Sequence, residues 1–470
     1  MIGRDQELKI LEEAALDDKS HFIAVYGRRR IGKTFLVREA YGYRFAFQHA
    51  GLYDGGLGDQ LEAFRQSLID AGYRPKRKPR SWLEAFGELK ELIRNSSEKK
   101  KVIFIDELSW MDTPKSKLIM ALEQFWNGWA SARKDIVLIV CSSATSWMLS
   151  NVIHNKGGLY NRLTEKLALN PFVLSECEEY VKSEGIVLNR GQILQYYMVF
   201  GGVPYYWTFL EKGLSLPQNI DRILFAEDAL LKDEFRYLFA SIFKNPTDHI
   251  RIIETLAKKR VGLTREELID ASGLVNSGDL TKRLEELESC GFIRKYMAFG
   301  MKKKNAMYQL IDNFTLFYYQ FMKDEPTDEH FWINHINTPV VNTWLGLSFE
   351  RVCLLHINQI KQKLGIAGVH TDVNSWYCGK DEDKGIYGSQ IDLLIVRADQ
   401  IIDLCEMKYS ESAYTVTEKL DKSMRRKIQD FTTLTGTKSA IHPILITTYG
   451  VVENAYSGNF QAVITMEDLF

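Results

Sequence analysis

Cysteine is scarce in this sequence and shows no pairing pattern. Six cysteines, at positions 141, 177, 290, 353, 378 and 405, are scattered over 470 residues without a C-x-x-C motif. Nine histidines are equally dispersed and form no H-E-x-x-H motif. A disulfide framework and a cysteine-rich zinc site are therefore disfavoured, and a reducing, cytoplasmic location fits best.

Long apolar runs and an excess of charge of one sign are also absent. No stretch reaches the roughly 18 apolar residues of a membrane span, and the N-terminus becomes charged too early for a signal peptide. Lys and Arg total 60 against 61 Asp and Glu, so a nucleic-acid site must be a local patch. At roughly 150 residues per domain, the length predicts about three domains.

Apolar patterning divides the chain into four segments. Residues 1–170 alternate short, continuously apolar runs with helical periodicity, which is typical of an α/β domain with a parallel sheet. Residues 171–245 lose the strand signal and predict a small helical domain. Residues 246–310 show three helices and a hairpin, the winged-helix pattern. Residues 311–470 alternate again and predict a second α/β domain.

A complete phosphate-binding motif lies between the first predicted strand, residues 22–26, and a predicted helix. Its residues are Gly27, Arg28, Arg29, Arg30, Ile31, Gly32, Lys33 and Thr34, which match G-x-x-x-x-G-K-[ST]. Glycines let backbone N–H groups surround phosphates at a helix N-terminus. Lys33 is expected to reach the β- and γ-phosphates of ATP, and the Thr34 hydroxyl to bind Mg²⁺.

Two acids follow the next buried strand, residues 102–105, as in a Walker B motif. Asp106 is expected to complete the Mg²⁺ shell, and Glu107 to orient or activate the attacking water. Ser142 ends the following strand, where a hydroxyl could contact the γ-phosphate or this water. Serines after strands are also common turn residues, so this second signal is weaker.

These motifs resemble AAA+-related ATPases of the STAND and origin-recognition type. Residues 2–8, Ile-Gly-Arg-Asp-Gln-Glu-Leu, resemble their N-terminal hydrophobic-G-R-E-x-E-L motif, which implies that Gly3 and Arg4 lie near the adenine. Residues 202–204, Gly-Val-Pro, resemble the G-x-P motif of the STAND helical lid, which implies a nucleotide contact by Pro204.

The resemblance extends over most of the chain. Arg162 looks like the lid-proximal arginine of these families, a finger acting in cis or in trans, so an oligomer is left open. The whole layout is similar to a family of archaeal and bacterial ATPases that carry a C-terminal nuclease-like domain. The triple arginine 28–30 is common in that family, and contact with phosphate or a partner and a solvated loop remain equal alternatives.

The predicted winged helix leaves its ligand open. Thr281, Lys282 and Arg283 lie on its third helix and Lys302–Lys304 on its wing, so a DNA backbone is a plausible ligand. Glu285, Glu286 and Glu288 share that helix and would repel DNA, which keeps a protein-packing role equally open. The proline-rich basic segment 74–80 is more simply a solvated linker.

Four residues of the C-terminal segment resemble the PD-(D/E)XK nuclease core. Asp392 lies on one predicted strand, Glu406 and Lys408 share one face of the next, and Glu350 opens the preceding helix. Such carboxylates bind Mg²⁺, and the lysine positions water for attack on a phosphodiester. The sequence departs from the pattern, because Gln390 stands where relatives often carry an acid and no proline precedes Asp392.

The sequence therefore predicts a cytoplasmic, Mg²⁺-dependent ATPase whose nucleotide state positions a winged helix and a restriction-endonuclease-like α/β domain. A nucleotide-gated switch that binds protein partners and retains an inactive nuclease-like scaffold is the alternative. A third hypothesis is a DNA-cleaving enzyme in which ATP is mainly regulatory. ATP turnover and metal-dependent DNA cleavage distinguish these functions.

Overall fold

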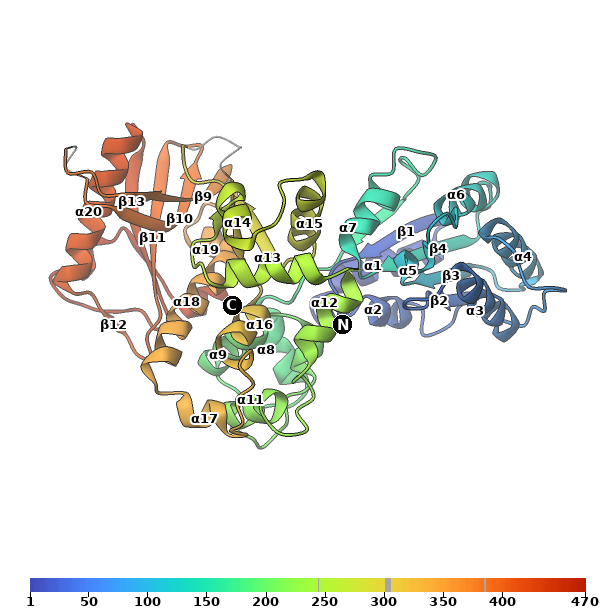
Figure 1. Ribbon diagram of the computed structural model, residues 1–470, viewed down its shortest axis with the longest axis horizontal. Coiled ribbons are helices and arrows are strands. Elements are labelled where there is room, and N and C mark those ends of the chain that lie inside the picture. The colour runs from blue at the N-terminus through green and yellow to red at the C-terminus, as the bar shows by residue number, and fades with distance from the viewer. Residues whose placement is uncertain (244, 301–305, 384–385) are drawn as a thin grey trace. The chain divides into compact units, whose positions relative to one another are not determined.

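The structure is a computed structural model that describes residues 1–243, 245–300, 306–383 and 386–470 (Figure 1). It forms two compact units. The first comprises Met1–Pro171, Tyr237–Pro246 and Glu285–Cys290, and the second comprises Phe172–Arg236, Thr247–Leu284 and Gly291–Phe470. None of the helices in the described ranges has the length and apolar character needed to cross a bilayer.

A five-stranded parallel sheet forms the centre of the first unit, in the order β2-β3-β4-β1-β5. Its strands are β1 (His21–Tyr26), β2 (Phe47–Ala50), β3 (Lys101–Asp106), β4 (Ile136–Ser142) and β5 (Glu165–Ala168). All seven residues of β4 are buried, as expected for a central strand covered on both faces. The α/β class expected from the apolar runs is confirmed in this unit.

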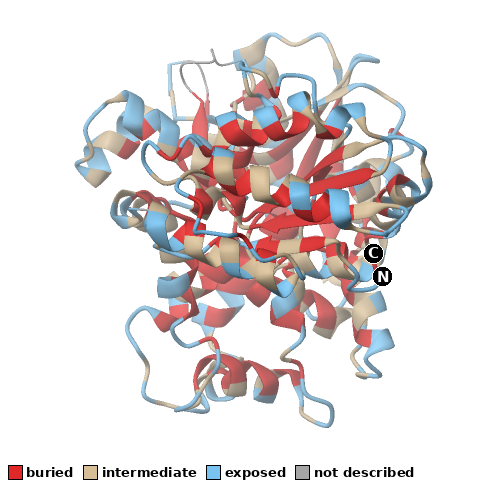
Figure 2. Cartoon of the chain, turned by 90° about the vertical axis from the view of Figure 1, so that its right-hand side faces the viewer, coloured by how far each residue is buried: buried red, intermediate tan, exposed pale blue. Residues whose placement is uncertain are grey.

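Helices cover both faces of this sheet because successive strand residues point to opposite sides. Phe22 and Ala24 of β1 enter a core with the helices that follow β2 and β3, whereas Ile23 and Val25 enter a second core with α1 and α2. The helices are α1 (Asp5–Leu16), α2 (Lys33–Ala40), α3 (Leu57–Asp70), α4 (Trp82–Asn95), α5 (Leu108–Met111), α6 (Leu118–Gly128) and α7 (Thr145–Met148). Figure 2 shows the buried strands at the centre of its view, with exposed residues on the outer helix surfaces.

The second unit begins with helices that come from two distant parts of the sequence. The earlier group is α8 (Leu174–Ser183), α9 (Arg190–Phe200), α10 (Pro204–Trp207), α11 (Leu216–Leu224) and the first residues of α12 (Glu234–Ile242), and the later group is α16 (Asn313–Phe317), α17 (Phe331–His335), α18 (Pro339–Leu355) and α19 (Ile357–Lys363). Helix α9 packs on α16 and α18, and α11 packs on α17 (Figure 1).

Specific contacts join these two groups of helices. The carboxylate of Asp221 accepts hydrogen bonds from the backbone N–H groups of Trp332 at 2.6 Å and Ile333 at 3.1 Å. The side-chain amide of Asn313 donates to the carbonyl of Tyr197 at 2.6 Å. Helices before residue 245 and after residue 310 are therefore joined by direct hydrogen bonds, and the four segments expected from the sequence stay a prediction.

The described residues between 247 and 310 form three helices and a small antiparallel sheet. Most of them belong to the second unit, and Glu285–Cys290 belong to the first. The elements are α13 (Thr247–Ala257), β6 (Leu263–Thr264), α14 (Arg265–Ser272), α15 (Gly278–Ser289), β7 (Ile293–Tyr296) and β8 (Met307–Leu310), with sheet order β6-β8-β7. A capping box begins α14, because the Thr264 hydroxyl accepts from the N–H of Glu267 at 3.3 Å and Glu267 accepts from the N–H of Thr264 at 2.8 Å. The basic residues Lys302–Lys304 of the predicted wing lie outside the described residues.

The C-terminal part is built on a mixed sheet in the order β15-β13-β11-β10-β9. Its strands are β9 (Thr371–Cys378), β10 (Ser389–Arg397), β11 (Ile401–Lys408), β13 (Ala440–Thr447) and β15 (Ala462–Ile464). Two short strands, β12 (Tyr414–Thr415) and β14 (Val451–Val452), pair beside it. Helix α18 packs on β11, and α20 (Glu418–Thr435) packs on β10, with Leu394, Leu404 and Phe431 among the shared core residues (Figure 1).

Candidate nucleotide site and C-terminal acidic cluster

The phosphate-binding loop joins β1 to α2 in a backbone conformation that requires glycine. Gly27 has φ +143°, and a Cβ at this position would lie 2.4 Å from the carbonyl oxygen of Leu169. Gly32 has φ +88° and forms the N-cap of α2. Because a side chain would clash at Gly27 and be strained at Gly32, the loop turns its backbone at the helix N-terminus, where anions bind.

Two functional side chains follow this loop on the first turn of α2. The buried Lys33 ammonium donates to the carbonyls of Gly27 at 2.9 Å and Arg28 at 2.8 Å, which holds it across the mouth of the loop. The Thr34 hydroxyl donates to Asp106 Oδ2 at 2.6 Å. This hydrogen bond joins the first turn of α2 to the last residue of β3. Hydroxyl and carboxylate oxygens are the ligands Mg²⁺ prefers, so this pair fits the magnesium site expected from the sequence.

Glu107 is held by the loop after β4. Its carboxylate accepts from the N–H of Ser143 at 3.1 Å and from the Ser143 hydroxyl at 2.6 Å. Its backbone is left-handed, with φ +46°, and its N–H donates to Asp106 Oδ1 at 2.9 Å. A non-glycine residue in this region is uncommon and is typical of a position that surrounding contacts hold in place.

The position expected of Ser142 is corrected by one residue. Ser142 is fully buried and its hydroxyl donates to Ser109 at 2.8 Å, so it lies within the core end of β4. The next residue, Ser143, carries the hydroxyl that contacts Glu107. A strand places neighbouring side chains on opposite sides, so an error of one residue moves the predicted contact away from the site.

The remaining residues predicted near the nucleotide differ in their surroundings. Arg4 is buried and donates to the carbonyls of Gly3 at 2.9 Å and Asn170 at 2.6 Å, which ties the N-terminal motif to the segment after β5. Arg162 is exposed. Of the triple arginine, Arg28 is buried, and Arg29 and Arg30 are partly buried.

The G-x-P segment of the second unit has a tightly constrained backbone. Pro204 begins α10, where its missing N–H is harmless. A Cβ on Gly202 would lie 1.8 Å from the carbonyl oxygen of Phe172, so only glycine fits there. This geometry explains the glycine and the proline by packing, and a contact of Pro204 with nucleotide stays a prediction.

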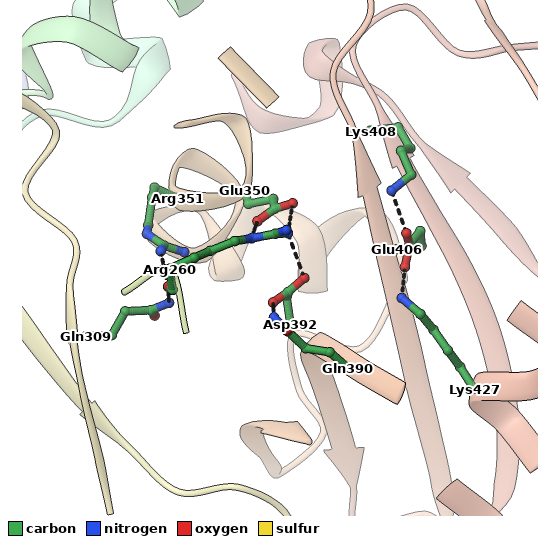
Figure 3. Close-up of polar contacts among 9 residues, drawn as sticks. All are labelled: Arg260, Gln309, Glu350, Arg351, Gln390, Asp392, Glu406, Lys408 and Lys427. Atoms are coloured by element: carbon green, nitrogen blue, oxygen red, sulfur yellow. Dashed lines mark hydrogen bonds and ion pairs between the residues drawn. The ribbon is translucent and has the colours of Figure 1, made fainter. Parts of the chain in front are cut away.

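A second polar cluster lies at one end of the C-terminal sheet (Figure 3). The guanidinium of Arg260 binds Glu350 through two nitrogens, its Nε donating to Glu350 Oε2 at 3.1 Å and its Nη2 to Oε1. The same Nη2 donates to Asp392 Oδ2 at 3.2 Å. The other oxygen of Asp392 accepts from the Gln390 amide at 2.5 Å. The structure thus brings Glu350 and Asp392 together around one cationic group.

Glu406 and Lys408 form a separate set of ion pairs beside the first (Figure 3). The Lys408 ammonium donates to Glu406 Oε1 at 2.5 Å, and Lys427 of α20 donates to Oε2 at 2.7 Å. Burial acts to raise the pKa of Glu406, but the charges of Lys427 and Lys408 and their hydrogen bonds outweigh it and lower that pKa below its ordinary value. Glu406 is therefore held ionised, as expected if Lys408 neutralises the acids.

The carboxylates of the two sets act on the same guanidinium. Burial lowers the pKa of Arg260, but the hydrogen bond to Glu350 and the charges of Glu350, Asp392 and Glu406 raise it above its ordinary value. Burial and the charge of Asp392 raise the pKa of Glu350, against the opposing effect of Arg260. Within the described ranges, no three acidic, histidine or cysteine side chains are grouped as metal ligands. The expected sharing of one cation by the acids is thus not the arrangement in this structure, because Arg260 and Lys427 neutralise them.

Sequence reasoning missed Ser143, Arg260 and Lys427. Ser143 had a usable signal, since it follows a buried strand beside the expected Ser142. Arg260 gave none, because it lies in the turn after α13, far in sequence from the acids it binds. Lys427 lies on the amphipathic helix α20, where a lysine is usually a solvated surface residue.

Comparisons with known proteins find ATPases among those similar to this chain. Residues 1–207 match a family model described as an ATPase domain predominantly from Archaea. An uncharacterized protein of Methanocaldococcus jannaschii is 25% identical over 434 residues, which cover 91% of each chain. Among solved structures, a Walker-type ATPase of Pyrococcus abyssi has a TM-score of 0.46 and 13% identity, covering 68% of this chain and 96% of its own. The ORC2 protein of Aeropyrum pernix, solved with ADPNP and ADP, has a TM-score of 0.40 and 16% identity, covering 73% of this chain and 94% of its own.

The family match spans the loop and acidic residues described above, including Lys33, Thr34, Asp106 and Glu107. It ends after the G-x-P segment and therefore does not cover the acidic cluster. Residues 1–207 of this chain are thus similar to the ATPase domains found predominantly in Archaea.

Proposed function

We propose that the chain is a Mg²⁺-dependent ATPase whose nucleotide state controls a C-terminal, metal-dependent nuclease-like centre acting on DNA. The observation that carries the ATPase proposal is the contact of Thr34 with Asp106 at 2.6 Å, beside the buried ammonium of Lys33. One hydroxyl, one carboxylate and one ammonium thus meet at the carboxyl ends of parallel strands, the edge where such sheets bind ligands.

Each of these residues has a distinct role in the proposed reaction. Thr34 and Asp106 would hold Mg²⁺, which neutralises charge on the phosphates when it is bound. Lys33, released from the loop carbonyls, binds the β- and γ-phosphates. Glu107 orients the attacking water, and Ser143 fixes the Glu107 carboxylate by donating to both of its oxygens. Arg162, being exposed, is available as a finger to its own or a neighbouring nucleotide.

The nuclease proposal rests on the acidic cluster. Glu350 and Asp392 are oxygen donors that contact one guanidinium, and carboxylate oxygen is the ligand type that a divalent metal takes. Glu406 and Lys408 share one face of β11, and the ionised pair can orient a water for attack on a phosphodiester. The metal would polarise the phosphate when bound.

The segment 247–310 is proposed to be a winged helix that contacts DNA or a protein partner. Arg283 is not available to either, because it pairs with Asp248 at 3.0 Å. Thr281 and Lys282 are exposed on α15, and so is Glu285, which disfavours DNA at that point. This observation favours a second candidate function, a nucleotide-gated switch whose α15 packs on protein and whose nuclease-like part is a scaffold.

Two assays on the full-length chain separate these functions. ATP turnover is measured with and without Mg²⁺ for wild type and Asp106→Asn, and cleavage of supercoiled plasmid is measured for wild type and Asp392→Ala. Mg²⁺-dependent turnover lost in Asp106→Asn, with cleavage lost in Asp392→Ala, supports the main proposal. Turnover without any difference in cleavage between wild type and Asp392→Ala supports the switch. Absence of Mg²⁺-stimulated turnover contradicts the ATPase mechanism.

A further inference from the structure

Helices α3 and α4 of the first unit (Figure 1) are joined by a strongly basic segment. Five of the seven residues from 74 to 80 are lysine or arginine, and the other two are proline. The chain as a whole has a net charge of -1, so this concentration of one sign departs from a balanced composition. Like charges at such close spacing repel one another, and a bound anion would relieve that repulsion.

The two prolines hold this segment, called the basic loop below, against the protein. Pro75 and Pro79 are buried, whereas each of the five cations is exposed. Just before the loop, the Tyr73 hydroxyl donates to Glu88 of α4 at 2.6 Å. A proline-rich basic stretch is typical of a solvated linker, but these contacts make it an ordered loop that presents its cations to solvent.

Carboxylates neutralise only part of the basic loop. Arg77 lies 3.5 Å from Glu84 Oε1, and Lys78 lies 3.3 Å from Glu62 Oε2. Glu62 is shared with Arg65, which lies 3.0 Å from its other oxygen. All of these side chains are well exposed, so each pair contributes little to stability.

Three cations of the basic loop are left for a ligand. Among the residues that the structure describes, no carboxylate forms an ion pair with the side chain of Arg74, Lys76 or Arg80, and all three are exposed. The backbone N–H of Arg80 donates to the Glu84 side chain at 3.0 Å, which fixes the end of the loop. Because the loop is already ordered, binding an anion to it costs little additional backbone entropy.

The exposed side chains of the basic loop indicate the kind of anion. All of them are cations, and none is an apolar side chain or an aromatic ring. Proteins that bind single-stranded nucleic acid stack bases on aromatic rings, and sites for a membrane surface combine cations with apolar side chains. The phosphates of a nucleic-acid duplex offer closely spaced negative charge and require neither.

We propose that the basic loop, residues 74–80, is a contact surface for the phosphate backbone of a nucleic-acid duplex and binds it without regard to base sequence. Arg74, Lys76 and Arg80 contact the phosphates. The surface belongs to the first unit and is distinct from the segment 247–310 and from the acidic cluster. It therefore does not depend on the proposed nuclease-like centre.

The test measures how tightly the full-length, nucleotide-free chain binds short fluorescent DNA and RNA duplexes of two unrelated sequences, by anisotropy at several salt concentrations. The loop variant removes the three cations that lack a carboxylate partner, Arg74→Gln/Lys76→Gln/Arg80→Gln. We expect it to bind both sequences about tenfold or more weakly than wild type. The slope of log K against log[salt] should fall in magnitude by about 3, or about 1 for each lost phosphate contact.

Two further variants test whether position and charge both matter. The control variant removes the same charge from exposed positions of the same unit outside the basic loop, Lys9→Gln/Lys134→Gln/Lys166→Gln, and should match wild type. Arg74→Lys/Arg80→Lys keeps the charge and should retain the wild-type slope. Circular dichroism shows whether each variant is folded. If the loop variant is not, Lys76→Gln alone should lower the slope by about 1.

The outcomes separate the basic loop from other sites on the chain. A reduced slope and weaker binding in the loop variant, with wild-type behaviour in the control variant, support the proposal, and the two duplexes show whether DNA, RNA or both are bound. Equal slopes in wild type and the loop variant overturn it and assign duplex binding to another segment. Equal losses in the loop and control variants overturn it, because net charge would then explain the binding. Binding of wild type to phosphatidylserine-containing vesicles but to neither duplex overturns it in favour of a membrane surface, and binding to none of these probes also overturns it.

Discussion

At the scale of single residues, contacts within the protein hold each functional side chain of the proposed nucleotide site. Lys33 is held by two loop carbonyls, Thr34 by Asp106, and Glu107 by Ser143. Each contact uses a donor or acceptor that ATP·Mg²⁺ or water would engage, so binding exchanges protein contacts for ligand contacts instead of ordering loose side chains. This exchange limits the entropic cost of binding.

Removing the ammonium of the loop lysine should weaken ATP binding. In Lys33→Ala we expect ATP affinity to fall by about 10- to 100-fold, the scale of a lost hydrogen bond to a charged group. Isothermal titration calorimetry measures this change. Lys9→Ala is a control, because Lys9 is exposed and pairs with Glu13 on α1. Unchanged affinity in Lys33→Ala would contradict the assignment of the phosphate site.

Replacing the proposed catalytic acid should separate binding from hydrolysis. Glu107→Gln keeps the side-chain size but loses the carboxylate, so ATP binding should persist while turnover falls by ~10² or more. Ser143→Ala removes the donor that positions Glu107, and we expect turnover to fall by about tenfold with KM unchanged. Steady-state kinetics measures both variants. A changed KM with unchanged turnover in Ser143→Ala would move that residue from positioning to substrate binding.

At the scale of helices and strands, His356 joins two parts of the second unit. Its Nε2 accepts from the N–H of Leu174 at the start of α8 at 3.1 Å, and its Nδ1 lies 2.8 Å from the carbonyl of Val352 in α18. The ring must therefore be neutral, with the proton on Nδ1. Burial lowers the pKa of His356 to about 4, a cost that the bond to Val352 only partly offsets.

Acid should loosen this junction before the whole chain unfolds. The folded pKa of about 4 lies below the unfolded value of 6.5, so the unfolded state binds more protons between these values. The contribution of the neutral His356 ring to the free energy of unfolding is therefore fully present above pH 6.5. On the order of 2–3 kcal/mol of it is lost as pH falls to about 4. Hydrogen exchange of the Leu174 amide, corrected for intrinsic rates, measures the effect.

His356→Gln should remove most of this pH dependence, and His370→Gln, at an exposed position, should retain it. If protection of Leu174 is equal at pH 7 and pH 4.5 in wild type, the junction does not depend on a neutral imidazole.

Local sequence patterns predicted individual helices and strands better than they predicted which strands pair. The central strands of the first unit were identifiable because runs such as Ile136–Val140 of β4 are apolar throughout. The edge strands β2 and β5 were missed, since an edge strand such as Glu165–Ala168 has one buried residue. Glu406 and Lys408 were predicted to share one strand, and both lie on β11 (Ile401–Lys408). The position of Asp392 was harder, because the pairing of β10 with β9 shifts between Ile391 and Leu394 and an irregularity of this kind re-aims side chains.

The residues of the candidate sites were predictable where a local motif carries them and not where distant segments meet. Lys33, Thr34, Asp106 and Glu107 were predictable because one loop and one strand end carry them, and each matches a local motif. Arg260 and Lys427 were not, since their roles arise from contacts over long sequence separations: Arg260 is 132 residues from Asp392. No local pattern encodes such a contact, and only the packed chain brings these charges together.

At the scale of the whole molecule, two helices are shared between the compact units. The first residues of α15, up to Leu284, belong to the second unit, whereas Glu285–Cys290 belong to the first, and α12 is divided similarly at Tyr237. The proposed control of the C-terminal part by nucleotide state requires that the nucleotide site and the acidic cluster be energetically coupled.

The coupling should be measurable as nucleotide-dependent metal affinity. With a non-hydrolysable ATP analogue bound, the proposed control predicts that Mn²⁺ binds the acidic cluster about 5- to 150-fold more tightly than with ADP, the usual range of allosteric coupling. Mn²⁺ also binds together with the nucleotide. Binding at the acidic cluster is therefore measured as the difference in bound Mn²⁺ between wild type and Asp392→Ala. Lys33→Ala should show no difference between the two nucleotides.

Because linkage is reciprocal, Mn²⁺ at the cluster must tighten binding of the analogue by the same factor. Equal Mn²⁺ affinities with analogue and ADP would mean that the two units work independently, and an unequal pair of factors would mean that the metal signal comes from another site.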